Sequence, residues 1–173
     1  MTITVSDILI APAKIFEVDG VDLGATAGGI EMHQQDTWTE VEADQYPDAI
    51  VAGLSKRIRT VHTQLLQAQL TNWQVAWGLT AGPALDGSNN NVLYVGLERL
   101  GKFHSVYFTG ISPDGVHERQ VTIHKAAITT QNAFTISKDK PHTFDLTFSI
   151  YPDTSQPAGE EFIKISDSAS ALY

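Results

Sequence analysis

The stretch TQLLQAQLTNWQVAWG, residues 63–78, carries the one clear helical pattern in this sequence. Its large apolar side chains recur at steps of four, three and four residues, which places them along one side of an α-helix. These side chains are Leu66, Leu70, Trp73 and Trp77. Gly78 suits the left-handed turn that often follows a helix end. The pattern therefore predicts a helix over Thr63–Gly78 whose Leu and Trp side chains form the packing face against a sheet.

The rest of the chain shows the alternation and the turn residues of β-strands. Asp19-Gly20, between two short apolar runs, is typical of a two-residue hairpin turn. In His142–Tyr151, apolar and polar residues alternate well. About eight or nine such segments and one helix predict a mainly β protein, an antiparallel β-sandwich or partial barrel with one flanking α-helix. We expect an N-terminal arm over residues 1–14, the β domain over residues 15–166 and a C-terminal tail over residues 167–173.

Composition excludes several classes of protein. The 173 residues include 20 acidic and 11 basic ones, a formal net charge of −9, which argues against wrapping nucleic acid. The chain has no cysteine, so disulfides and thiolate chemistry are excluded. It shows neither the pattern of a secretory signal nor an apolar segment long enough to span a membrane. We expect a soluble chain, made in the cytoplasm, that does not bind membranes.

No combination of residues has the spacing of an active site. The six histidines are scattered, without the short spacings of a zinc site. Gly110-Ile111-Ser112 begins like a nucleophile elbow, but Pro113 and Asp114 follow where the motif needs a glycine two positions after the serine. We therefore expect no catalytic residues, no cofactor and no metal, and a protein that is not an enzyme.

Three acids share one face of a predicted strand. Glu40, Glu42 and Asp44 alternate with uncharged residues, and Trp38 has the same parity. Three like charges on one face repel each other, so that face must be solvated. It is either an ordinary wet strand face or the acidic lining of a water-filled space.

Two further sets of side chains are candidates for a subunit interface. Arg57 and Arg59 belong to the only basic cluster, and they are expected to pair with acids on an adjacent strand or on a neighbouring subunit. The predicted helix carries uncharged polar side chains on its other face, namely Gln67, Asn72 and Gln74. Such a face costs less to desolvate than one with Lys or Glu, so we expect it to lie against a neighbour.

Several segments form a characteristic series along the chain. They are Glu17–Gly24 followed by Ala27–Ile30, Trp38–Pro47, the strand and helix over Ile58–Gly78, His124–Ile128, and Phe144–Ile165 with Tyr151-Pro152-Asp153 leading a long loop. Taken in this order, they resemble the major tail-tube proteins of bacteriophages. The resemblance covers about residues 15–166 and rests on the order of its segments. The N-terminal arm and the loop Gly87–Asn91 have no counterpart in the family pattern.

The resemblance implies a structural virion protein. Family members form hexameric rings that stack into a hollow tube, whose lumen conducts the tape-measure protein and the genomic DNA into the host. The implied partners are further copies of the chain, the tape-measure protein, the tail terminator, baseplate or tail-tip proteins and, in a contractile tail, a sheath protein. The implied location is the virion tail, after assembly in the host cytoplasm. Glu40, Glu42 and Asp44 would then line the lumen and repel DNA, which would pass without specific binding.

Two questions stay open at the level of sequence. Contractile tails, tailocins and the type VI secretion tube share the tube fold, and the sequence does not separate them. The alternative from another class is a monomeric β-sandwich binding module, a carbohydrate or adhesion domain, in which Trp38 and Tyr46 would stack on a sugar.

Overall fold

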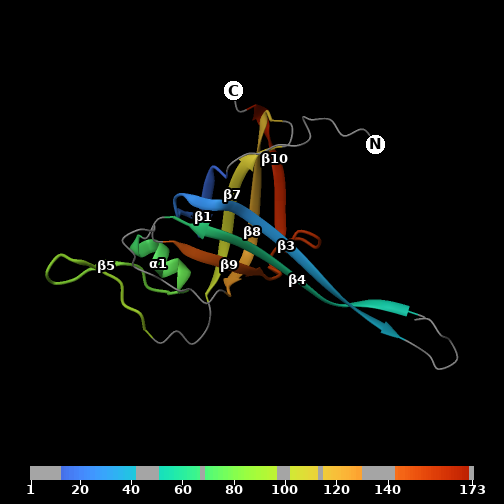
Figure 1. The fold of residues 1–173 in the computed structure, drawn as a ribbon, viewed down its shortest axis with the longest axis horizontal. Helices are drawn as coiled ribbons and strands as arrows, with labels where there is room; N and C mark the ends of the chain where they lie inside the picture. The colour runs from blue at the N-terminus through green and yellow to red at the C-terminus, as the bar shows by residue number, and fades with distance from the viewer. Residues whose placement is uncertain are drawn as a thin grey trace.

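The computed structural model describes residues 13–41, 51–66, 69–96, 102–112, 115–129 and 143–171. This part of the chain is mainly β, antiparallel and sandwich-like, with one short helix, which confirms the predicted fold class (Figure 1). The elements are β1 (Ile15–Val18), β2 (Val21–Asp22), β3 (Thr26–Val41), β4 (Val51–Leu65), α1 (Leu70–Ala76), β5 (Ala84–Leu85), β6 (Asn91–Val92), β7 (Phe103–Ile111), β8 (His117–Ile128), β9 (Phe144–Ile150) and β10 (Ile163–Ala171).

Strand β8 joins the two layers of the fold. The main sheet runs in the order β2-β1-β7-β8-β9-β4-β3, and β10 also pairs with β8. One edge of β8 pairs with β7, whereas its other edge is divided between β10, along residues 117–123, and β9, along residues 126–128. The sheet therefore turns a corner at β8. Phe16 of β1 then lies near Phe148 of β9, with ring centroids 6.3 Å apart.

The core fills the space between these layers. Strand β9 alternates as predicted, and its even-numbered side chains are all buried; they are Phe144, Leu146, Phe148 and Ile150. Val61 of β4, Val106 of β7 and Ile123 of β8 are fully buried with them. Helix α1 lies beside this core, where the Trp73 ring meets the Phe144 ring edge-on at 5.0 Å.

The helix is shorter than the sequence pattern predicted. It spans Leu70–Ala76, and Thr63–Leu65 belong to β4 instead. There the strand pairs with β3 on one side and β9 on the other, so its backbone groups are satisfied by two neighbours. The predicted helix stop is confirmed in part, because Gly78 has a positive φ of 62°.

Two of the four side chains that were predicted to pack against the sheet do not do so. Trp73 packs against the core, and Leu70 is half-buried. Leu66 and Trp77 are exposed, because Leu66 lies outside the helix and Trp77 ends it. The buried face of α1 is made instead by Asn72, Val75 and Ala76, at the i, i+3 and i+4 positions.

The C-terminal boundary also differs from the prediction. Strand β10 extends to Ala171 and pairs with β8, so residues 167–171 continue the domain and are not a tail. An ion pair joins the two strands where this segment begins, since the Arg119 guanidinium donates hydrogen bonds of 2.8 and 2.9 Å to the Asp167 carboxylate.

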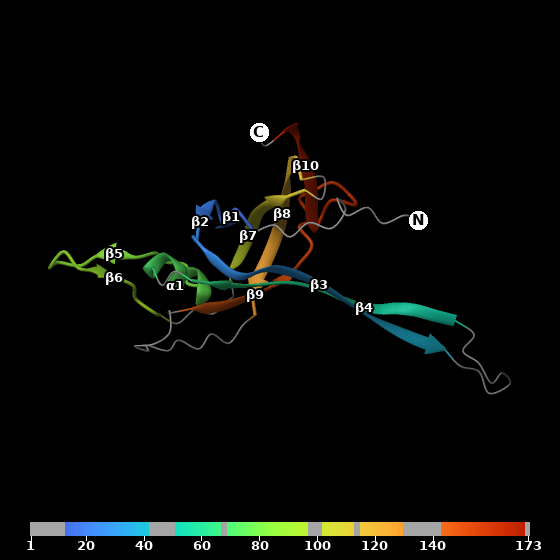
Figure 2. The same ribbon diagram turned by 45° about the horizontal axis from the view of Figure 1, so that its top comes forward.

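Strands β3 and β4 continue well beyond the rest of the sheet. Strand β4 pairs with β9 only over residues 60–65, while its pairing with β3 runs on to Val51. Residues 34–41 of β3 and 51–59 of β4 thus form a two-stranded extension, here called the ribbon, which projects from the body in both views (Figures 1 and 2). Eight residues of strand make it about 27 Å long.

Candidate interaction surfaces

The ribbon is exposed to solvent on both of its faces. Among its residues whose side chains the structure describes, none is buried, and Trp38 and Leu54 are 57% and 41% exposed. An isolated two-stranded hairpin is only marginally stable in water, because it has no layer to pack on. A covering partner would therefore stabilise the ribbon.

The register sorts the ribbon side chains onto two faces. Residues directly opposite each other in an antiparallel pair share a face. The face that continues the core side of the sheet carries four cross-strand pairs, which are Gln34 with Arg59, Asp36 with Arg57, Trp38 with Leu54, and Glu40 with Ala52. We call it the inner ribbon face.

Arg57 binds Asp36 on the inner ribbon face. Its guanidinium donates two hydrogen bonds, of 2.7 and 2.8 Å, to the two carboxylate oxygens. These bonds are the main cause that lowers the pKa of Asp36, and they raise the pKa of Arg57. Of the two partners that the sequence left open for Arg57, the adjacent strand is the one in the structure.

Arg59 connects the base of the ribbon to the body. Its Nε donates a 3.0 Å hydrogen bond to the side-chain oxygen of Gln34. Its guanidinium carbon lies 4.4 Å from the centroid of the Phe162 ring, just before β10, in a cation–π contact. Both arginines thus have partners within the chain, and their role at a subunit interface stays a prediction.

The predicted acidic face is described in part. Glu40 is exposed and shares the inner ribbon face with Trp38, as parity predicted, while Glu42 and Asp44 lie outside the described residues. Asp36 lies on the same face, but its charge is matched by Arg57. Glu40 is therefore the one described acid of the inner ribbon face without an opposite charge across the strands.

Asn72 was predicted to lie at a subunit interface, and this prediction is wrong. This side chain is 1% exposed, and its Nδ2 donates a 3.0 Å hydrogen bond to the Leu23 carbonyl inside the body. A short polar side chain is buried here because it satisfies a carbonyl at the end of the β1–β2 hairpin. Gln74 is half-buried and donates a long 3.5 Å bond to the Leu79 carbonyl, and Gln67 lies outside the described residues.

A partly exposed cluster around Asp19 was not predicted from the sequence. Its carboxylate accepts hydrogen bonds from Lys102 Nζ at 2.8 Å, His104 Nδ1 at 3.0 Å and the Ser105 backbone N–H at 2.9 Å. Burial raises the pKa of Asp19, but these bonds together outweigh burial and lower it. Asp19-Gly20 was recognisable as a turn, whereas nothing in the sequence pairs it with a strand more than eighty residues away.

The Asp19 cluster lacks the accessibility of a catalytic dyad. The carboxylate orients the His104 ring as it would in a triad, but the His104 side chain is 2% exposed. Within the described residues, His104 Nε2 has no hydrogen-bond partner, and so no nucleophile is joined to it. The arrangement fixes the β1–β2 turn onto β7, which is a structural role.

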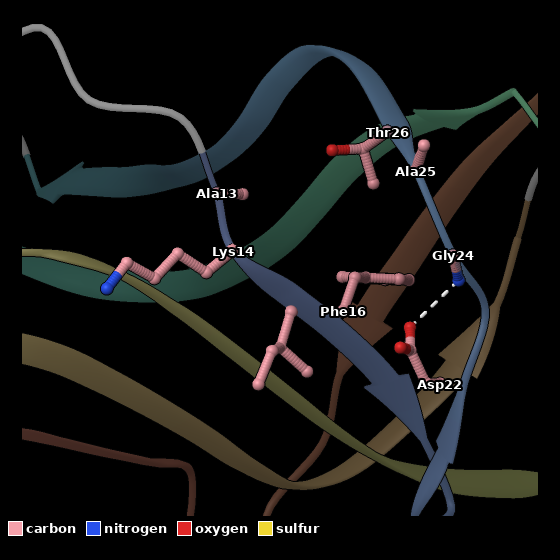
Figure 3. A pocket seen from close by; sticks show the side chains of 8 residues that line it. Ala13, Lys14, Phe16, Asp22, Gly24, Ala25 and Thr26 are labelled. Atoms are coloured by element: carbon pink, nitrogen blue, oxygen red, sulfur yellow. Dashed lines mark hydrogen bonds between the residues drawn. The ribbon is translucent and has the colours of Figure 1, made fainter.

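Two open cavities of about 320 Å³ each lie along the start of β3. The first is shown in Figure 3, where Lys14, Asp22 and Thr26 are among its lining residues and Asp22 accepts a 2.8 Å bond from the Gly24 N–H. The second is more apolar and lies between Ile30 and Met32 of β3 and Phe108 of β7. Neither is lined by a histidine that could act as a general base.

The described residues hold no group of three or more His, Asp or Glu side chains that could bind a metal ion. Within the same ranges of the chain, no helix is long and apolar enough to cross a membrane. As a sugar platform, Trp38 has the required exposure, but Tyr46 lies outside the described residues. In comparisons with known proteins, no family model matches the chain and no curated protein sequence is significantly similar to it.

Proposed function

We propose that this chain is a structural subunit of a phage-type tail tube, which assembles with copies of itself into stacked rings around a hollow lumen. The observation that carries the proposal is the ribbon. It projects from a well-packed body with both faces exposed, and it presents an apolar pair, Trp38 and Leu54, beside charges that are already matched. A surface of this kind is suited to burial against a second protein.

The unpaired edge of β3 supports the same proposal. Among the described strands, β3 ends the main sheet, so its outer backbone groups have no neighbouring strand over sixteen residues. Monomeric proteins usually protect so long an edge, because it invites pairing with another chain. In a ring of identical subunits, each such edge is covered by the next copy.

The net charge fits passage of DNA without binding. A chain with a formal charge of −9 repels phosphates over distances of about one Debye length. Glu40 adds one exposed carboxylate to that charge. The resemblance of the sequence to tail-tube proteins supplies the rest of the proposal, including the hexameric ring.

Negative-stain electron microscopy of the purified chain, over a range of protein concentrations, tests this function. We expect rings or hollow tubes whose length increases with concentration. A protein that remains a monomer of 18.8 kDa in sedimentation at the highest concentration would exclude a tube subunit and would favour the monomeric binding module instead.

A further inference from the structure

A second projection lies at the end of the molecule opposite the ribbon. Among the described strands, β5 and β6 pair only with each other, apart from the main sheet. The hairpin that they form extends beyond α1, whereas the ribbon extends from the far side of the body, in both views (Figures 1 and 2). The two projections therefore cannot meet within one chain, whereas those of two copies can.

The tip of this hairpin is ordered by one of its own side chains. The Asp86 carboxylate accepts hydrogen bonds from the backbone N–H groups of Ser88 and Asn90, at 2.7 and 2.8 Å, and from Asn90 Nδ2 at 3.0 Å. The bond from the Asn90 N–H is the main cause that lowers the pKa of Asp86. Between Thr80 and Gly96, Asp86 is the only charged residue. The one charge of the hairpin is thus stabilised within its own loop.

The hairpin leads into an exposed aromatic side chain. Tyr94 is 73% exposed, the highest fraction among the large apolar side chains that the structure describes. It has the parity of Val92, which stands opposite Ala84. Leu85 is also exposed, but it stands opposite Asn91, on the other face of the hairpin. Tyr94 is therefore the side chain of this projection that gains most from a covering protein surface.

The net charge limits which surfaces of two copies can meet. Identical chains with a formal charge of −9 repel each other, so contact favours surfaces without unmatched acids. The hairpin is one such surface. The inner ribbon face around Trp38 and Leu54 is another, because Arg57 matches Asp36 and Glu40 alone is unmatched among its described residues. The chain thus carries two apolar patches in nearly neutral surroundings, one on each projection.

We propose that the β5–β6 hairpin of one copy docks on the inner ribbon face of the next copy, with Tyr94 packed against Trp38 and Leu54. The inference rests on the self-assembly proposed above, and it names the surface that covers the ribbon. Two aromatic rings pack well edge-to-face, and Leu54 supplies an apolar neighbour. Each copy presents its hairpin to one neighbour and its ribbon to another. Such a head-to-tail contact repeats from copy to copy and closes into a ring or continues as a filament.

Disulfide trapping between copies tests this contact, because the chain has no cysteine of its own. Chains with Tyr94→Cys are mixed with chains with Leu54→Cys, in which Trp38 is kept. Under mild oxidation, the mixture should form a disulfide between position 94 of one chain and position 54 of the other, identified by mass spectrometry after proteolysis. Circular dichroism of the reduced variants verifies that they fold.

Two further mixtures are the matched controls. In the first, Leu85→Cys replaces Tyr94→Cys, which moves the thiol to the other face of the hairpin. In the second, Lys56→Cys replaces Leu54→Cys, which moves the thiol to the other face of the ribbon, opposite Thr37. We expect the disulfide between positions 94 and 54 to form at least about tenfold faster than either control disulfide, because docking raises the effective concentration of its two thiols.

Electron microscopy of the same samples separates failure of the docking from failure of the tube. Rings or tubes in which the test disulfide forms no faster than the controls would overturn the docking and leave the proposed function standing. Monomers without a preferred disulfide would overturn both. A fast disulfide between positions 94 and 54 in particles without a lumen would support the docking and contradict the tube.

Discussion

The Arg57 guanidinium holds the Asp36 carboxylate through two hydrogen bonds, of 2.7 and 2.8 Å, across two strands that have left the body of the protein. Beyond this pair, Trp38 stands opposite Leu54 on the same face. Along the inner ribbon face, a matched pair of charges is therefore followed by an apolar pair, and Glu40 carries the one unmatched charge among the described residues. Such a face favours contact with protein over exposure to water, and this is the physical basis of the assembly that we propose.

Arg57→Glu should impair assembly while leaving the body folded. The new carboxylate would face Asp36 directly, and like charges opposite each other in a ladder are unfavourable. Because the site is exposed and outside the core, the melting temperature by circular dichroism should change little. Sedimentation velocity should show a smaller fraction of assembled protein than in the wild type.

Lys56→Glu is the matched control for this variant. It makes the same change of charge one residue away, but Lys56 lies opposite Thr37 on the other face of the ribbon. We expect Lys56→Glu to assemble better than Arg57→Glu. Equal assembly of the two variants would show that the Asp36–Arg57 pair has no specific role.

Replacing Trp38 and Leu54 together by serine should abolish assembly at little cost to the monomer. Both side chains are exposed in the single chain, so the free energy of unfolding should change by no more than about 0.5 kcal/mol. Leu85→Ser removes a side chain that is 66% exposed on β5 and serves as the control. If the double variant forms particles as readily as Leu85→Ser, the apolar pair is not an interface.

Asp19→Asn should destabilise the fold by about 1–2 kcal/mol at neutral pH, because it weakens the bonds to Lys102 and His104 at a partly exposed site. Asparagine tolerates the positive φ of 53° at this position, so backbone strain does not confuse the result. Chemical denaturation of wild type and variant measures the difference.

The same variant has a defined dependence on pH. The pKa of Asp19 lies below its ordinary value of 3.8 in the folded chain, so the contribution of the charged carboxylate is complete above that value. It is lost as the pH falls through the lower, folded pKa. The gap in stability between wild type and Asp19→Asn should therefore narrow as the pH falls below 3.8. A gap that stays constant from pH 7 through the acid unfolding range would contradict the role of this charge, with the exposed Glu160→Gln as a control.

Asn72→Ala should cost about 1–3 kcal/mol of unfolding free energy, because it leaves a buried carbonyl of Leu23 without this donor. Gln74→Ala, at a half-buried position with one long hydrogen bond, should cost less. Thermal unfolding compares the two. A loss for Gln74→Ala as large as that for Asn72→Ala would contradict the assignment of Asn72 to the core.

Local patterns in the sequence predicted much of the fold. The alternation in β9 and the Asp19-Gly20 turn are both found, because each depends on neighbours in the chain. The predicted start of the helix was wrong. Thr63–Leu65 fit the period of a helix, but as part of a strand they pair with β3 on one side and β9 on the other. Only the tertiary arrangement decides between these two options.

The candidate surfaces were less predictable for a related reason. Parity placed Glu40 and Trp38 on one face, and this is the arrangement in the structure. It did not reveal that Arg57 matches Asp36 or that Asn72 is buried, because both depend on contacts between distant segments. The same limit hid the Asp19–His104 bond and the two cavities that Ala13 lines.

A cryo-electron microscopy reconstruction of the particles that the purified chain forms tests the central claim most directly. We predict stacked rings around an open lumen, in which the ribbon, residues 34–41 and 51–59, is covered by neighbouring copies and Trp38 is buried. Particles without a lumen, or rings in which the ribbon remains free in solvent, would contradict this account.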